Sequence, residues 1–276
     1  MSKIAAIQMC STGLVGENLA AVDVLVKDAV ADGAKAVVLP ENFALMPMQK
    51  QDLLECANNH ESAINGHLSN LAANLGIVIV AGSFPAPSQF PYRILASCRV
   101  YEQDGRMLAR YDKSHLFDVV ISEDESYLES EYTAYGDSVV AVDTSVGKLG
   151  LTICYDMRFP ELFRALKQQG VDVYTVPSAF TVPTGKAHWD VLLRARAIEN
   201  IAYLVAPAQV GQHPSGRLTY GHSMIVSPWG EVLALKQEGV GYCIADLNLQ
   251  SMLQQRKKFP ALDHQRIFIN ESMRDF

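Results

Sequence analysis

Three residues of types that nucleophilic catalysis uses stand where strand-like runs of this 276-residue chain end: Glu41, Lys113 and Cys154. A thiol can attack a carbonyl carbon, a carboxylate can accept the thiol proton, and an ammonium group can stabilise the negative charge that develops. In open α/β sheets, active sites gather just beyond the carboxyl ends of strands, where loops hold side chains against a rigid scaffold. We therefore hypothesise that these residues form a nucleophile, a base and an electrostatic stabiliser.

Cys154 differs from the other cysteines in its sequence context. Free cysteine is among the most buried residue types, so packing is the default role of any one cysteine. The polar residues Asp156 to Arg158 come directly after Cys154, which predicts a strand-to-helix turn that exposes the thiol. Such a turn near a helix N-terminus lowers the pKa of a thiol from its ordinary value of about 8.5. The remaining cysteines lie within strand-like or helix-like runs, where packing explains them: Cys10, Cys56, Cys98 and Cys243.

The residue types by themselves leave other roles open. Glu41 alone fits a solvated loop charge, and Lys113 fits a surface lysine beside an aspartate. A hydrolase that pairs Cys154 with His115 or His222 also agrees with the composition of the site. The sequence contains no H-x-x-x-H pair, no G-x-G-x-x-G or P-loop motif and no G-x-S-x-G motif. These absences argue against a zinc hydrolase, a nucleotide-binding enzyme and a serine hydrolase of the elbow type.

The composition indicates a globular protein of a reducing compartment. Apolar residues make up 49% of the chain and charged residues 19%, which excludes a disordered chain. The formal net charge of −7 argues against nucleic acid as a partner, because such sites need clustered Lys and Arg. No run approaches the ~18 unbroken apolar residues of a membrane span. Scattered cysteines without a C-x-x-C pair, and a strand-like start where a secretory leader would stand, favour the cytoplasm.

The elements that must position these residues alternate between strand and helix patterns along the chain. Apolar residues at helical spacing predict helices, and Gly33 and Gly76 stand where a helix C-terminus favours glycine. No linker-like segment interrupts the pattern, so we predict one domain over residues 1–276. Helices are predicted at 17–31, 62–75, 159–169 and 185–200, and strands at 4–10, 36–39, 77–82, 149–155, 171–177 and 201–206.

Two hairpins of similar build are predicted far apart in the sequence. One covers residues 97–111 around Asp104-Gly105, and the other covers residues 224–234 around Pro228-Trp229-Gly230. Because a strand, a turn with glycine and an apolar strand recur in the same order, the hairpins suggest two half-sheets of similar build. We predict an α/β fold of two stacked sheets with outer helices, and a single doubly wound sheet is the alternative.

Three segments carry a resemblance to a known family. They are Leu39-Pro40-Glu41, Lys113-Ser114-His115-Leu116-Phe117 and Ile153-Cys154-Tyr155-Asp156-Met157-Arg158-Phe159-Pro160-Glu161-Leu162. Through these segments, in this order and at this spacing, the chain resembles the nitrilase superfamily of carbon–nitrogen hydrolases along nearly its whole length. The long third segment is the most specific. The resemblance implies a four-layer α-β-β-α sandwich in a single domain, often assembled into homodimers or higher homo-oligomers, and a site without metal or organic cofactor.

Within the superfamily, the chain is similar to the Nit branch through the segments Pro177–Phe180, Ala187–Glu199, Ala208–His213 and Tyr220–Met224. This similarity implies an amidase of metabolite repair that hydrolyses a small carboxylate-bearing primary amide to an acid and ammonia. The expected substrate is deaminated glutathione, with 2-oxoglutarate and cysteinylglycine-type products. The alternatives are an ω-amidase acting on α-ketoglutaramate, a true nitrilase that releases ammonia from a nitrile, and a non-catalytic binding protein of the same fold.

The resemblance also implies a role for each site residue. Glu41 matches the general base, Lys113 the catalytic lysine and Cys154 the nucleophile, which replaces the cysteine–histidine alternative. Glu129 matches a second glutamate that orients the lysine and the substrate. One departure from the family pattern lies close to Glu129, because the loop at residues 118–126 is acidic here where relatives commonly carry a Pro-Gly turn.

A substrate that carries carboxylates needs positive partners in the pocket. Arg158, four residues after the nucleophile, is the nearest candidate, although it can also pair with a neighbouring carboxylate. We expect the backbone N–H of Tyr155 to face the developing oxyanion together with the lysine. Phe180 and Thr184, on the loop after the strand at 171–177, are expected to line the pocket. Three arginines are weaker candidates for the carboxylate: Arg194, Arg196 and Arg217.

Overall fold

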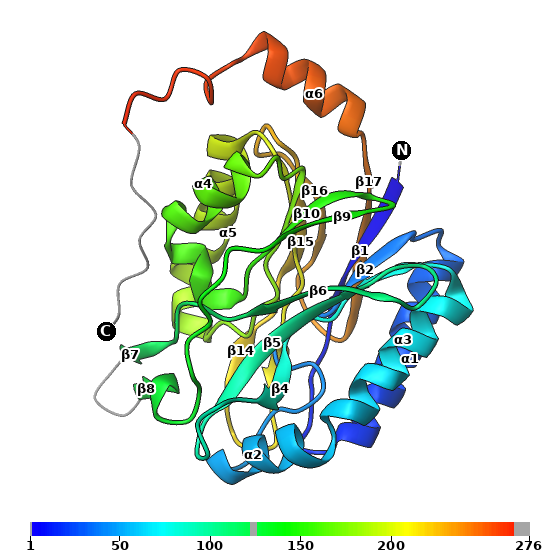
Figure 1. Ribbon diagram of the computed structural model, residues 1–276, viewed down its shortest axis with the longest axis vertical. Coiled ribbons are helices and arrows are strands. Elements are labelled where there is room, and N and C mark those ends of the chain that lie inside the picture. The colour runs from blue at the N-terminus through cyan, green and yellow to red at the C-terminus, as the bar shows by residue number, and fades with distance from the viewer. Residues whose placement is uncertain (1, 122–125, 268–276) are drawn as a thin grey trace.

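The computed structural model describes residues 2–121 and 126–267. Most of the acidic run that departs from the family pattern, Glu123-Asp124-Glu125, lies outside the described residues. Two large sheets face each other and carry helices on their outer sides (Figure 1). No helix within the described residues has the length and apolarity to cross a membrane.

The first sheet has seven strands in the order β17-β1-β2-β3-β5-β4, and β6 pairs with β5 outside this path. Strands β1, β2 and β3 run parallel, and the other strands join them antiparallel. The bounds are β1 Ser2–Gln8, β2 Ala36–Val38, β3 Val78–Val80, β4 Phe84–Pro87, β5 Ile94–Tyr101, β6 Met107–Asp112 and β17 Gly241–Leu247.

The second sheet has six strands in the order β16-β15-β12-β11-β10-β9. Its central strands β10, β11 and β12 are parallel, and the flanking strands are antiparallel. The bounds are β9 Ala141–Thr144, β10 Gly147–Leu151, β11 Val173–Thr175, β12 Tyr203–Ala206, β15 Ser223–Val226 and β16 Val232–Lys236.

The two sheets repeat one pattern of pairing. In each sheet, an antiparallel strand (β17 or β9) pairs with the first of three neighbouring parallel strands. The third parallel strand (β3 or β12) pairs with the first strand of an antiparallel hairpin, which is β5–β6 in the first sheet and β15–β16 in the second. Both hairpins that the sequence predicts are therefore confirmed, one in each sheet. The prediction of two stacked sheets is also confirmed, and the alternative of one doubly wound sheet is wrong.

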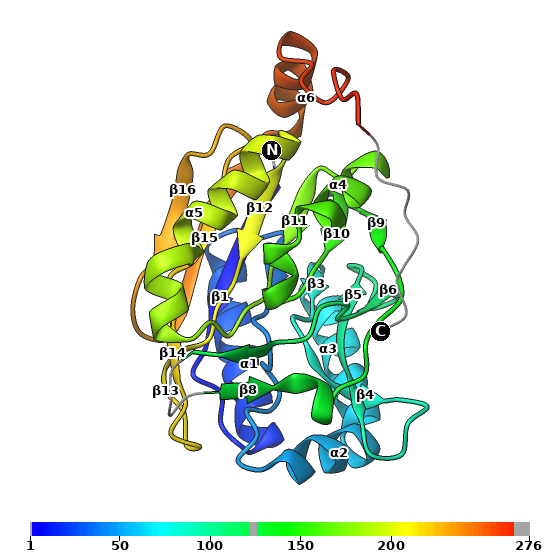
Figure 2. The same cartoon turned by 90° about the vertical axis from the view of Figure 1, so that its left-hand side faces the viewer.

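Helices cover the outer face of each sheet and complete the four layers. Figure 1 shows α1 Val15–Ala31 and α3 Glu61–Leu75 on one side, and α4 Pro160–Gln168 and α5 Val182–Asn200 on the other. Figure 2 looks onto the α4–α5 side and shows α6 Leu249–Lys258 at one end of the molecule, beyond the sheets. The shorter elements are α2 Lys50–Asn59, β7 Asp118–Val120, β8 Ser126–Leu128, β13 Val210–Gln212 and β14 Leu218–Tyr220.

Alternation along β1 explains the layers. Ala5 and Ile7 belong to the core shared with α1 and α3, whereas Ile4 and Ala6 belong to the core shared with the second sheet. Successive side chains of a strand point to opposite faces, so a strand buried on both faces reads as a continuous apolar run. That is how the uninterrupted apolar runs of the sequence become the two inner layers of the sandwich.

The predicted strand at 149–155 ends earlier than expected. Strand β10 stops at Leu151, and a 3₁₀ turn occupies Cys154–Arg158. The buried Asp156 carboxylate accepts the backbone N–H of Ile153 at 2.7 Å, so it caps the turn as the third residue of a capping box does. Cys154 itself has φ +49, a left-handed conformation that an L-residue rarely adopts. The polar residues after the cysteine therefore do form a turn, and the cysteine belongs to that turn and not to the strand.

Candidate active site

Glu41 lies just beyond the end of β2 and is held there by the second half of the molecule. The side chain of Gln209, which is fully buried, donates a hydrogen bond of 3.0 Å to the backbone carbonyl of Glu41. The next residue, Asn42, has φ +58, and its N–H donates to the hydroxyl of Ser83. These contacts fix the backbone on both sides of the Glu41 carboxylate, which is 5% exposed.

Lys113 follows β6 and is 1% exposed, so its ammonium group must find its partners within the protein. Its Nζ lies 2.7 Å from Glu41 Oε1 and 2.9 Å from Glu129 Oε2. Glu129 begins a 3₁₀ turn after β8, and its Oε2 also accepts the N–H of Phe117 at 2.7 Å. Lys113 is thus clamped between two carboxylates that arrive from different parts of the chain.

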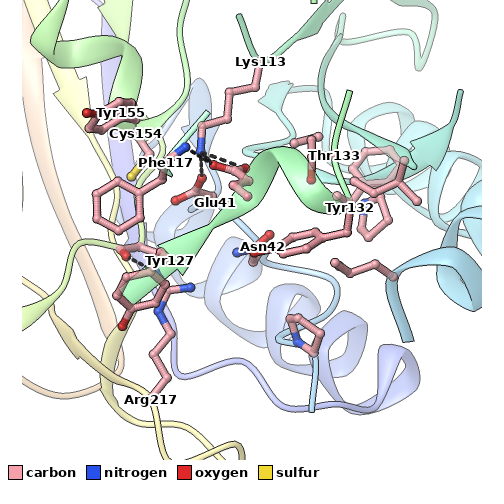
Figure 3. A pocket seen from close by; sticks show the side chains of 18 of the residues that line it. Glu41, Asn42, Lys113, Phe117, Tyr127, Tyr132, Thr133, Cys154, Tyr155 and Arg217 are labelled. Atoms are coloured by element: carbon pink, nitrogen blue, oxygen red, sulfur yellow. Dashed lines mark hydrogen bonds and ion pairs between the residues drawn. The ribbon is translucent and has the colours of Figure 1, made fainter. Parts of the chain in front are cut away.

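Cys154 meets this cluster from the second sheet. Its N–H donates to the carbonyl of Pro177 at 2.8 Å, which ties the turn to the end of β11. The thiol donates a hydrogen bond to the carboxylate of Glu41, and the N–H of Ala179 donates to the sulfur. Figure 3 shows Cys154, Glu41 and Lys113 directed toward one another. The three residues that the sequence singles out are therefore brought together.

Asp156 joins the lysine segment to the cysteine turn. Its carboxylate is completely buried and accepts a hydrogen bond of 2.7 Å from the hydroxyl of Tyr111. It also accepts the N–H of His115 at 3.1 Å and lies 2.7 Å from Nδ1 of the same residue. The His115 ring stacks on Phe159 with centroids 3.7 Å apart. His115 is therefore engaged with Asp156, and the thiol of Cys154 has Glu41 as its hydrogen-bond acceptor.

Burial decides the ionisation of the thiol. Desolvation raises the pKa of Cys154, and the Glu41 carboxylate raises it further, against a smaller opposing effect of Lys113. The expectation of an exposed thiol with a lowered pKa is wrong, because the side chain is 7% exposed and faces a carboxylate. Burial and Glu41 therefore both favour the neutral form of the Cys154 thiol.

The charged partners shift in directions that fit their contacts. Burial alone would raise the pKa of Glu41, but Lys113 holds it below its ordinary value. Burial would likewise lower the pKa of Lys113, but the carboxylates of Glu129 and Glu41 keep it well above its ordinary value. Burial raises the pKa of Glu129, against the opposing charge of Lys113. The site thus combines a charged lysine, an ionised Glu41 and a thiol.

A cavity opens next to this cluster. Tyr155, Phe180 and Thr184 line it, as the sequence predicts, and so does Arg217. Arg158 is not among the lining residues: its NH1 lies 3.2 Å from Nδ1 of His188, and its guanidinium lies over the rings of Tyr155 and Phe180.

Two other arginines also lie elsewhere. Arg194 donates to the carbonyl of Gly230, and Arg196 donates to the carbonyl of Met157 and pairs with Glu199. Of the four arginines named from the sequence, Arg217 is the one that reaches the cavity. Since it lies 63 residues after Cys154 (217 minus 154), proximity in sequence could not have selected it.

Apart from Phe117 and Ala179, the further lining residues lie outside the sequence motifs. The aromatic rings of Phe117 and Tyr127 lie 5.1 Å apart, and Phe117 contacts Tyr155 edge-on at 5.2 Å. The remaining lining residues are Asn42, Pro47, Leu53, Phe84, Pro85, Ile94, Ala96, Tyr132, Thr133 and Ala179. A concentration of aromatic residues around Lys113 and Glu129 is the one sequence feature that could have pointed to this wall.

Comparisons with known proteins agree with this geometry. The family model described as carbon–nitrogen hydrolase matches residues 3–257. A Synechocystis protein named deaminated glutathione amidase is 44% identical over 268 residues, which cover 96% of this chain and 98% of that protein.

Two solved structures share the fold. The Caenorhabditis elegans NitFhit protein matches with a TM-score of 0.91 at 36% identity, over 96% of this chain and 65% of that one. Saccharomyces cerevisiae Nit3, described as a member of branch 10 of the nitrilase superfamily, matches with a TM-score of 0.84 at 30% identity, over 94% of each chain.

Proposed function

The chain belongs to the carbon–nitrogen hydrolase family and is an amidase of the cysteine type, and we propose that it hydrolyses a small amide bearing a carboxylate. In this proposal Cys154 is the nucleophile, Glu41 the general base and Lys113 the electrostatic stabiliser. Glu129 orients Lys113, and Tyr155, Phe180 and Thr184 contact the substrate. The chemistry is the conversion of an amide and water to an acid and an amine, or to an acid and ammonia where the amide is primary.

The first half of the reaction makes a thioester. Glu41 accepts the proton of Cys154 while the sulfur forms a bond to the amide carbon, and the carbonyl electron pair moves to the oxygen. Lys113 and the backbone N–H of Tyr155 stabilise that oxyanion, and one such donor in a desolvated site contributes about 3–4 kcal/mol. The protonated Glu41 then returns its proton to the amide nitrogen, the carbon–nitrogen bond breaks and the amine leaves, as cysteinylglycine from deaminated glutathione or as ammonia from a primary amide.

The second half releases the acid. Glu41, again ionised, accepts a proton from water as the water oxygen attacks the thioester carbon. The carbon–sulfur bond breaks, the sulfur regains a proton from Glu41, and the carboxylic acid departs. One group thus alternates between base and acid, which suits a carboxylate hydrogen-bonded to the thiol in the free protein.

One observation supports this mechanism above all: Lys113 Nζ lies 2.7 Å from a Glu41 carboxylate that also accepts the thiol of Cys154. Burying a lysine and two carboxylates is weak evidence for a stabilising role, because desolvation offsets most of the attraction within an ion pair. Such a cluster, beside a thiol in a cavity, favours catalysis over a binding protein that merely keeps the fold.

Deaminated glutathione is the substrate that we propose, since a relative 44% identical to this chain is named for its hydrolysis. The test measures 2-oxoglutarate and cysteinylglycine released by the purified protein from deaminated glutathione, and ammonia released from α-ketoglutaramate and from a nitrile of similar size. We expect the highest kcat/KM for deaminated glutathione and no release by the Cys154→Ala variant. Turnover confined to α-ketoglutaramate or to the nitrile would contradict the substrate, and undiminished turnover by Cys154→Ala would contradict the mechanism.

Two further points belong to this proposal. We propose that the protein acts in the cytoplasm, in keeping with its cysteines, all of which are free. We also propose a homodimer or higher homo-oligomer, supported by the exposed apolar side chains Val191 and Ile198 on α5 and the nearby Trp229. Light scattering should give at least twice the monomer mass, and a Val191→Lys variant should reduce it.

A further inference from the structure

Arg217 stands apart from the other charged groups that line the active-site cavity. The other charged groups are Glu41, Lys113 and Glu129. The charge of Lys113 is already compensated by two carboxylates at 2.7 and 2.9 Å. Among residues 2–121 and 126–267, no carboxylate forms an ion pair with Arg217. Arg217 therefore supplies the cavity with a positive charge that the described part of the chain does not neutralise.

The donors of Arg217 are only partly satisfied. One terminal nitrogen donates to the carbonyl of Ala179 at 2.7 Å, and the guanidinium lies over the Tyr127 ring, 5.3 Å from its centroid. The Nε atom is buried and has no hydrogen-bond partner in the described residues. A buried donor without an acceptor carries a desolvation cost, so an acceptor that enters the cavity would relieve it.

The backbone fixes where this cation lies. Arg217 precedes β14 in the β13–β14 hairpin, where His213 donates its N–H to the Arg217 carbonyl at 2.9 Å. Gly216, with φ +86, closes the turn immediately before it. A residue held in a hairpin places its side chain with less loss of entropy on binding than a residue on a long loop.

Ala179 couples the cation to the nucleophile. Its N–H donates to the sulfur of Cys154, and its carbonyl accepts the guanidinium of Arg217. Figure 3 shows Arg217 reaching into the cavity from the side opposite Lys113, with Phe117 and Tyr127 between them. A substrate whose amide carbon meets the sulfur would extend its far end toward Arg217.

We propose that Arg217 binds a carboxylate of the substrate and thereby selects carboxylate-bearing amides over neutral ones. This inference rests on the proposed amidase function and assigns the specificity of that same site. The planar guanidinium presents paired N–H donors that match the two oxygens of a carboxylate. Arg158 does not compete for this role, because its guanidinium lies outside the cavity lining, against His188.

The test compares two amides of equal length, glutaramate and pentanamide, in which a methyl group replaces the carboxylate. We expect the wild-type protein to prefer glutaramate in kcat/KM. The Arg217→Gln variant should lose roughly 10- to 100-fold on glutaramate, mainly through KM, and change little on pentanamide. Arg217→Lys keeps the positive charge but lacks the paired N–H donors. Its kcat/KM on glutaramate should therefore lie between the values of the wild type and of Arg217→Gln. If Arg158→Gln loses the preference for glutaramate and Arg217→Gln keeps it, the proposal is overturned.

Binding to a variant without the nucleophile separates the two hypotheses. Calorimetry on Cys154→Ala should show glutaramate binding more tightly than pentanamide, and adding Arg217→Gln should remove the difference. Equal binding of the two amides to Cys154→Ala would overturn the role of Arg217, even if Arg217→Gln fails to fold. If glutaramate binds through Arg217 but no amide is hydrolysed by the wild type, the role of Arg217 stands and the proposed function fails.

Discussion

The hydroxyl of Tyr111 donates a 2.7 Å hydrogen bond to the carboxylate of Asp156, and through it the strand that delivers the lysine is joined to the turn that delivers the cysteine. Tyr111 lies in β6 of the first sheet, two residues before Lys113, and Asp156 lies two residues after Cys154, beyond β10 of the second sheet. The relative position of Lys113 and Cys154, two of the residues that we propose for catalysis, therefore depends on a buried contact that neither of them makes.

Tyr111→Phe should weaken both stability and catalysis. Removing the hydroxyl leaves one carboxylate oxygen of Asp156 short of a buried donor, which costs about 1–3 kcal/mol. We expect that loss in the free energy of unfolding measured with denaturant, together with a lower kcat, because the turn at Cys154 loosens. Tyr174→Phe is the matched control, since its buried hydroxyl donates to the Phe163 carbonyl away from the cavity. It should lose similar stability and keep its kcat, and equal kcat values in both variants would contradict the coupling.

Gln209→Leu should impair catalysis without changing the residues that touch the substrate. The lost amide leaves the Glu41 carbonyl and the hydroxyl of Ser11 without their buried donor. We expect kcat to fall more than KM changes, because the carboxylate is displaced rather than removed. The exposed Gln212, three residues along the same segment, provides the control variant Gln212→Leu. An equal change of kcat in Gln209→Leu and Gln212→Leu would show that the hydrogen bond from Gln209 to the Glu41 carbonyl does not position the Glu41 carboxylate.

The ionisation of Cys154 gives a spectroscopic prediction. Because burial and Glu41 raise the pKa of this thiol, the free protein should show no thiolate absorbance attributable to Cys154 at neutral pH. The measurement is an ultraviolet pH titration of the wild type minus that of Cys154→Ala. A thiolate step below pH ~8.5, the ordinary thiol value, would show that the site ionises the sulfur before substrate arrives.

The pH profile of kcat/KM should be set by Glu41 on the acid side. Lys113 holds the pKa of Glu41 below its usual value of about 4.3, so the base remains ionised throughout the neutral range. Lys113 has a raised pKa, so its charge persists as pH rises through the usual lysine value of about 10.4. Activity should therefore change little between these two values while the protein stays folded. An acid limb near pH 6 would indicate that another group, such as a histidine, controls the reaction.

The same shifts predict how stability depends on pH. Glu41 has a folded pKa below its unfolded value, so its ion pair stabilises the fold above pH ~4.3 and is lost as pH falls through the folded value. Glu129 shifts upward, so its ionised form opposes folding and Glu129→Gln should not lower stability as strongly as Glu41→Gln. Thermal unfolding of the two variants at neutral pH and in mild acid checks this order. A larger loss of thermal stability in Glu129→Gln than in Glu41→Gln would contradict this prediction.

The order of elements was accessible to sequence reasoning because it depends on local patterns. The helix ending before Gly33 and the helix ending at Gly76 were placed by apolar spacing and by glycines whose φ values are positive, +95 and +62. The hairpins were placed by their turn residues, which need no knowledge of distant parts of the chain. The apolar pattern extends the strand to residue 155 and so does not place Cys154 in the 3₁₀ turn, because the Asp156 carboxylate that caps this turn makes a side-chain contact that periodicity does not report.

The order of residue types along the chain shows which side chains follow which strands, and this is enough to make Glu41, Lys113 and Cys154 candidates for one site. Their ionisation and their neighbours depend on how the chain folds. The thiol pKa depends on burial by both sheets, and the choice of Arg217 over Arg158 depends on a hairpin that returns to the cavity far along the chain. Desolvation and contact are properties of the space around a side chain, and that space is filled by residues distant in sequence.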